Sequence, residues 1–168
     1  MPIPDFVLDL RAKIGTDPLW LVATTAVVLD GDRVLLIRRA DTGEWAPISG
    51  IVDPAEEPAA AAIRETAEEA GVEIAVERLS STWVTAPVVY ANGDRARYLD
   101  IAFRCRYLSG DPHPADGEAL ETAWFPVDRL PDLRPDFAAR VRHALVAEGP
   151  AHFEIDAPDW SRDPRSGV

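Results

Sequence analysis

Three glutamates, Glu65, Glu68 and Glu69, stand close together in an alanine-rich stretch of the chain. On a helix, residues three and four apart share one side, so these carboxylates would lie together. Like charges at that spacing cost an isolated helix roughly 0.2–0.5 kcal/mol per pair. A bound divalent cation would offset this cost, and oxygen donors without a nearby His or Cys favour Mg²⁺ or Mn²⁺. The alternative interpretation is a solvated acidic face, which is the commoner origin of such clusters.

A helix expected over residues 58–70 must position these carboxylates. Proline suits the first turn of a helix, and Gly71 stands where a helix-ending glycine belongs. At about 100° per residue, the side opposite the glutamates is apolar, and we expect it to face the core: Ala60, Ile63, Ala67 and Ala70.

The rest of the chain alternates between strand and helix patterns. Turn signals at residues 30–32 and 92–93 predict two hairpins. In residues 99–107 apolar and polar side chains alternate, which predicts a strand with one apolar face. We expect strands over 19–29, 34–37, 73–79, 83–90, 99–107 and 122–127, a loop over 40–56, and helices over 3–14 and 137–146. This order predicts an α+β domain.

Composition excludes several classes of function. The chain has 168 residues and a formal net charge of −12, which argues against an unaided grip on nucleic acid or an anionic membrane. Cys105 is the single cysteine, so neither an intrachain disulfide nor a cysteine zinc site is expected. No apolar run approaches the length of a membrane span, and the charged N-terminal segment does not match a signal peptide. We therefore expect a cytoplasmic protein.

A longer pattern surrounds the glutamates. Gly50, Glu56 and the run Arg64-Glu65-Thr66-Ala67-Glu68-Glu69-Ala70-Gly71-Val72 match the spacing of the Nudix hydrolase signature. The chain resembles that family over residues 19–147, with an N-terminal helical extension at 1–18 and a C-terminal tail at 148–168. Thr66 departs from the aliphatic residue usual at its position. Ile48 and Ser49 stand where the family commonly has proline and glycine. The resemblance implies an α/β/α sandwich with a mixed central sheet.

The resemblance also implies roles for individual residues. It implies metal binding by Glu65, Glu68, Glu69 and the backbone carbonyl of Ser49, and catalytic roles for Glu65, Glu69, Arg64 and Glu118. It leaves open which carboxylate is the general base, and whether Glu56 joins the metal shell or holds the loop before the helix. Arg64 is expected to anchor that loop or a neighbouring carboxylate. Substrate contacts are expected from Arg39, Gly50 and Tyr90.

The implied activity is metal-dependent hydrolysis, with Mg²⁺ or Mn²⁺, of the pyrophosphate bond in a small nucleoside diphosphate derivative, releasing a nucleoside monophosphate. Two positional markers disagree about the substrate, since Pro87 matches ADP-ribose enzymes and Tyr90 matches dinucleoside polyphosphate enzymes. Oxidised nucleoside triphosphates stay open as well. The alternative function is a catalytically silent nucleotide sensor, although the signature glutamates are all present. A homodimer through exposed Phe6 and Leu10 is also expected.

Overall fold

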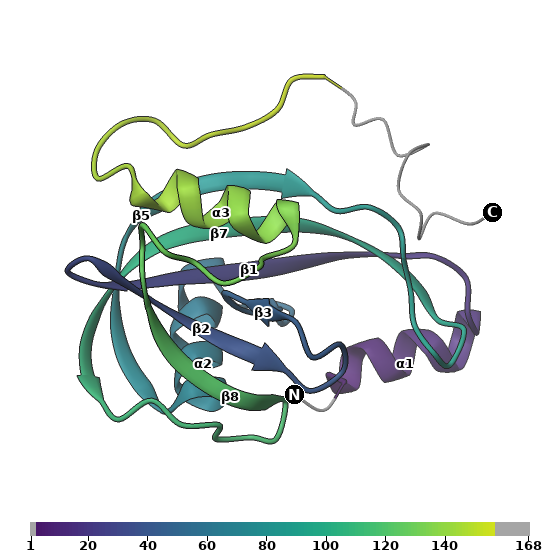
Figure 1. The fold of residues 1–168 in the computed structure, drawn as a ribbon. Coiled ribbons are helices and arrows are strands. Elements are labelled where there is room, and N and C mark those ends of the chain that lie inside the picture. Colours follow the sequence, from purple (N-terminus) through teal and green to yellow (C-terminus); the bar gives the residue numbers. More distant parts are fainter. Residues whose placement is uncertain (1–2, 157–168) are drawn as a thin grey trace.

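A mixed eight-stranded sheet forms the middle layer of the computed structural model, which describes residues 3–156 (Figure 1). At its centre β1 (Leu19–Asp30) forms the expected hairpin with β2 (Arg33–Arg39) and runs parallel to β7 (Arg95–Gly110). β5 (Val72–Val84) continues the sheet beyond β7. β3 (Trp45–Ala46) and β8 (Ala119–Pro126) both pair with β2. β4 (Ile48–Ile51) pairs with β1, and β6 (Val88–Val89) pairs with β7.

Helices cover both faces of this sheet. α2 (Pro58–Ala70) packs on one face and α3 (Pro135–Leu145) on the other (Figure 1). Side chains of β1 alternate between the two cores, because neighbours along a strand point to opposite faces. Val28 packs in the α2 core, and Val27 packs in the α3 core. The predicted α/β/α sandwich with a mixed sheet is therefore confirmed.

The orientation of α2 differs from the expectation. Its bounds agree with the prediction, and Gly71 ends it in a left-handed conformation with φ of 67°. The predicted core residues Ala60, Ile63 and Ala67 are exposed, whereas the buried residues are Ala61, Ala62, Glu65, Thr66, Glu69 and Ala70. Two of the three glutamates thus face the sheet. Hydrophobicity alone pointed to the wrong side, because the buried side combines small residues with two glutamates.

Three strand predictions also need correction. The expected loop over 40–56 contains β3 and β4, which are too short to show an alternating pattern. The expected strand 73–79 continues to Val84 as β5, whose pairing with β7 shifts register at several points and so obscures the alternation. The expected strand 83–90 is instead divided between the end of β5 and the short β6. β7 is covered on both faces, since buried Asp100 and Ala102 lie on the side predicted to be polar and open.

α1 (Asp5–Ile14) packs at one end of the sheet (Figure 1). Its Val7 is buried with Leu21 and Ala96, and Phe6 packs partly against that cluster. Phe6 and Leu10 are thus half-buried within the chain rather than exposed. Among residues 3–156, no helix is long and apolar enough to cross a membrane. At the other terminus, His152 forms two backbone hydrogen bonds with β5, while residues 157–168 of the predicted tail lie outside the described residues.

Candidate active site

Glu65 lies between α2 and the sheet, directly against Gly50 of β4. Its side chain is fully buried, and a Cβ built on Gly50 would lie 2.0 Å from the Glu65 carboxyl carbon. Only glycine leaves room at this position for the carboxylate. The spacing between Gly50 and the helix therefore has a steric reason, because the glycine makes the space into which the glutamate folds.

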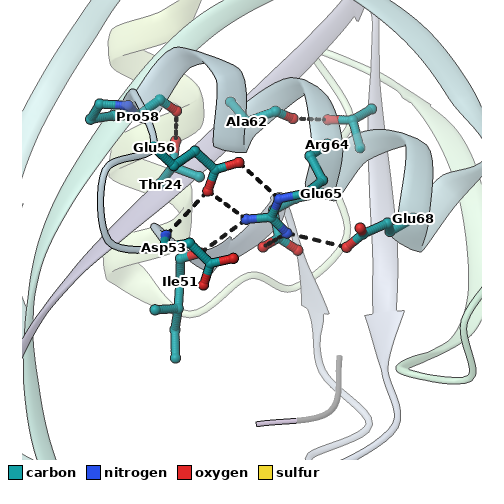
Figure 2. A network of polar contacts seen from close by, with 10 residues as sticks. Thr24, Ile51, Asp53, Glu56, Pro58, Ala62, Arg64, Glu65 and Glu68 are labelled. Carbon is teal, nitrogen blue, oxygen red and sulfur yellow. Dashed lines mark hydrogen bonds and ion pairs between the residues drawn. The ribbon is translucent and has the colours of Figure 1, made fainter. Parts of the chain in front are cut away.

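Arg64 gathers the neighbouring carboxylates around one guanidinium (Figure 2). It donates hydrogen bonds to Glu56 at 2.8 and 2.9 Å, to Glu65 at 2.8 Å and to Glu68 at 3.2 Å. Its Nη2 also donates to the Ile51 carbonyl at 3.2 Å. Glu56 in turn accepts the Asp53 backbone N–H at 3.1 Å. Arg64 thus ties the loop after β4 to the helix, and Glu56 holds this loop.

Glu69 faces the space between the end of β2 and the loop after β7. It is 2% exposed, and its charge interacts with Arg39 and with Asp116. The loop is docked on the end of α2, because the backbone N–H groups of His113 and Ala115 donate to the carbonyls of Ala70 and Glu69. Main-chain contacts with the helix thereby bring a second acidic segment to Glu69.

Burial shifts the protonation of both inward-facing glutamates. Desolvation raises the pKa of Glu65 to about 7, although the charge of Arg64 opposes this shift. Desolvation also raises the pKa of Glu69 to about 8, and the charges of Glu65 and Asp116 add to the effect against the opposing charge of Arg39. Each group therefore binds a proton more tightly than an exposed carboxylate, since burial removes the water that would solvate the charged form.

These carboxylates fit a hard divalent cation. One oxygen on each, Oε2 of Glu65 and Oε2 of Glu69, is buried without a hydrogen-bond partner. Buried polar atoms are normally paired, so these two oxygens call for a ligand. Glu68, one helical turn from Glu65, adds a third carboxylate, whose present partner is Arg64. Within residues 3–156 no three Asp, Glu, His or Cys side chains already form a metal cluster.

The other predicted site residues are divided between this site and its borders. Ser49 precedes Gly50 on β4 and pairs with Thr25 of β1. Glu118 lies beside the end of β2, since its carbonyl accepts the Ala40 N–H at 2.7 Å. Arg39 donates to Asp41 at 2.7 and 2.9 Å. Tyr90 is half-exposed and near enough to Arg39 for its charge to act on the guanidinium.

Two departures from the signature are explained by local packing. Thr66 is buried, and its hydroxyl donates to the Ala62 carbonyl at 2.7 Å, so its polar atom is satisfied within the helix. Ile48 is fully buried in the α2 core. Trp45, three residues before Ile48, packs edge-on against Phe125 at 4.9 Å between ring centroids. None of these three side chains needs a ligand to explain its position.

The structure adds neighbours that the sequence did not single out. Asp116 shares its loop with Glu118 and acts on Glu69, but spacing alone could not choose between two acids two residues apart. Tyr98 shares a hydrogen bond of 2.5 Å with Tyr90 between their hydroxyls. It lies on β7, and no local pattern marked it, because the pairing of β6 with β7 creates the contact.

Comparison with known proteins agrees with this geometry. The model of the NUDIX domain family matches residues 19–146. A MutT-like protein from Streptomyces ambofaciens is 32% identical over 135 residues, covering 79% of this chain and 82% of that protein. The NAD-capped RNA hydrolase NudC from Deinococcus radiodurans is 37% identical over 97 residues, covering 56% of this chain but only 31% of that protein. A crystal structure of a NUDIX hydrolase from Nitrosomonas europaea matches with a TM-score of 0.64 at 22% identity, covering 79% of this chain and 76% of that one. The chain therefore belongs to the Nudix hydrolase family.

Proposed function

We propose that the chain hydrolyses the pyrophosphate bond of a small nucleoside diphosphate derivative with Mg²⁺ or Mn²⁺ and releases a nucleoside monophosphate. The observation that carries this proposal is the pair of buried carboxylates, Glu65 and Glu69, each with one oxygen that has no partner. An acidic protein can hold an anionic pyrophosphate only if a cation neutralises both partners. Membership of the Nudix family supports the same reaction class.

Glu65, Glu68 and Glu69 would hold the ion, together with the backbone carbonyl of Ser49. When bound, such an ion lowers the pKa of a coordinated water and polarises the phosphoryl oxygen. Arg64 keeps Glu65 and the loop at Glu56 in place through its hydrogen bonds. The general base is one of Glu65, Glu69 and Glu118.

Arg39 is the proposed contact for the substrate phosphates. Burial works to lower the pKa of Arg39, but Asp41, followed by Glu69 and Tyr90, raises it overall, so the guanidinium stays charged. Its present bidentate partner, Asp41, is exposed, and a phosphate offers the same two-oxygen geometry. Tyr90 presents a half-exposed ring on which a base can stack. Gly50 contributes by leaving space for Glu65.

The experiment is a panel of substrates in Mg²⁺, with products identified by mass. It covers ADP-ribose, NAD, dinucleoside polyphosphates, and ordinary and oxidised nucleoside triphosphates. We expect a nucleoside monophosphate as one product. NAD and a short NAD-capped RNA form a separate pair, because the NudC relatives act on capped RNA. The net charge of −12 leads us to expect cleavage of the free nucleotide in preference to the RNA.

The second candidate is a nucleotide sensor that binds without turnover. The three signature glutamates favour the enzyme, since all are present and two of them, Glu65 and Glu68, are held by Arg64. Tight binding of one panel member without cleavage of any would establish the sensor. A homodimer and a cytoplasmic location stay predictions, and light scattering of the purified chain tests the first.

A further inference from the structure

α1 lies outside the residues matched by the family model and is fastened to the turn between β6 and β7. The link is Arg11, whose side chain is only 12% exposed. Its Nη1 donates to the carbonyl of Asp17 at 2.6 Å, and its Nη2 donates to the carbonyl of Arg95 at 2.6 Å. Its Nε lies 3.5 Å from Oδ2 of Asp94. One guanidinium thus bridges the end of α1 and the hairpin turn.

The hairpin turn makes a second contact with the segment after α1, and its backbone hydrogen bonds include Tyr90. Arg95 donates through its Nε to the Thr16 carbonyl at 3.2 Å, which closes a second link between the two segments. The Asp94 carbonyl accepts the backbone N–H of Tyr90 at 2.9 Å, and the Tyr90 carbonyl accepts that of Gly93. The position of Asp94 therefore determines where Tyr90 lies.

Tyr90 ends this chain of contacts, and its ring is the surface on which we propose that the nucleotide base stacks. Its hydroxyl is 2.5 Å from that of Tyr98, on the strand that follows the turn. Its hydroxyl interacts electrostatically with the Arg39 guanidinium, which also interacts with the Glu69 carboxylate. The half-exposed Tyr90 ring is therefore fixed at both ends, by the turn at its backbone and by Tyr98 at its hydroxyl.

We propose that Arg11 is a positioning residue, which holds the Tyr90–Asp94 turn so that the Tyr90 ring meets the nucleotide beside Arg39. This inference rests on the proposed function, because it assigns Tyr90 to the substrate. It gives the N-terminal extension a role in substrate affinity. Arg11 itself does not reach the reacting atoms and acts only through the turn.

The test uses full-length Arg11→Met, which removes the guanidinium and keeps an unbranched side chain. Lys13→Met is the matched control, because Lys13 is an exposed cation on the same helix. KM and kcat are measured for ADP-ribose in Mg²⁺, in the wild-type and in the Tyr90→Ala background. Hydrogen exchange at the amides of Tyr90 and Gly93 is followed in parallel without substrate.

We expect Arg11→Met to raise KM by at least about threefold, with kcat within about twofold, and Lys13→Met to change neither. In the Tyr90→Ala background Arg11→Met should leave KM unchanged. The inference is overturned if Arg11→Met leaves KM unchanged in the wild-type background, or if it raises KM equally in the Tyr90→Ala background. If the wild type does not cleave ADP-ribose, the proposed function fails for that substrate. Exchange then decides the inference, since faster exchange at Tyr90 and Gly93 in Arg11→Met supports it and unchanged exchange contradicts it.

Discussion

The two faces of the central sheet each bury charged side chains, but they balance these charges differently. Under α3, Asp100 accepts the Thr25 hydroxyl at 2.7 Å and lies 3.4 Å from the Arg140 guanidinium. Asp136 pairs with Arg134 and Arg140 beside it. Two acids thus meet two bases and the charges balance, while Nε of Arg140 is buried without a hydrogen-bond partner. Under α2, Arg64 is surrounded by three carboxylates, those of Glu56, Glu65 and Glu68. Glu69 lies on the same helix and also faces the sheet. One oxygen of Glu65 and one of Glu69 are buried without a hydrogen-bond partner.

This difference separates a structural ion pair from a site. Burying a charge is costly unless it is paired, so a balanced group is explained by packing alone. An unbalanced group of carboxylates costs stability, and a protein retains it only where a ligand restores the balance. We therefore assign the Asp100–Arg140 pair to the fold and propose a functional role for the α2 carboxylates.

Replacement of Glu69 by Gln should break the function of one face and leave its packing intact. The amide keeps the shape of the side chain and removes a charge that burial disfavours. We expect turnover to fall by about 10²-fold or more, in the range typical of a lost acid–base or ligand group, with a thermal midpoint equal to or above that of the wild type. Glu68→Gln should lose turnover in the same way. A wild-type rate in either variant would contradict the assignment of ligands.

Replacement of Arg140 by Met, under α3, should lower the stability of the fold and leave turnover unchanged. It leaves Asp100 buried beside one hydroxyl, and the loss of one partner from a buried pair costs about 3–5 kcal/mol of unfolding free energy. Turnover per folded molecule should stay at the wild-type level. Urea unfolding measures the loss, with Arg142→Met as the control because Arg142 is exposed on the same helix. A variant as stable as the control would show that the pair is dispensable.

Gly50→Ala sharpens the account of how the site fits against the sheet. The added methyl overlaps the Glu65 carboxylate, so we expect a loss of about 1–3 kcal/mol in stability and a fall in turnover. In a Glu65→Ala background the same substitution should cost almost no stability, since the overlap is gone. Equal costs in the two backgrounds would mean that the glycine is needed for another reason.

The dependence of stability on pH gives a further test of the same face. Folded Glu65 and Glu69 have pKa values of about 7 and about 8, above the ordinary 4.5. Their protonation stabilises the metal-free fold fully below about pH 4.5, and this stabilisation is lost as the pH rises towards 8. In EDTA the thermal midpoint should therefore decrease as the pH is raised from 5.5 to 8.5. Addition of Mg²⁺ should raise the thermal midpoint more at pH 8.5 than at pH 5.5. The Glu65→Gln, Glu69→Gln double variant should lack this contribution.

The sequence predicted the parts of the site that follow from spacing. The bounds of α2 and its glycine cap both follow from residues close together in the chain. The side of α2 that faces the sheet could not be predicted in this way, because its buried carboxylates violate the hydrophobic pattern. The contacts of Asp116 with Glu69 and of Arg11 with Asp94 depend on segments far apart in the sequence, and no local pattern reveals such contacts.

The Mg²⁺ dependence of hydrolysis tests the central claim most directly. Wild-type protein is incubated with the substrate that the panel selects, first in Mg²⁺ and then in EDTA, and the products are identified by mass. We predict release of a nucleoside monophosphate in Mg²⁺, almost none in EDTA, and recovery when Mg²⁺ is restored. Cleavage in EDTA at the rate seen in Mg²⁺ would contradict the claim that the carboxylates under α2 act by holding a metal ion.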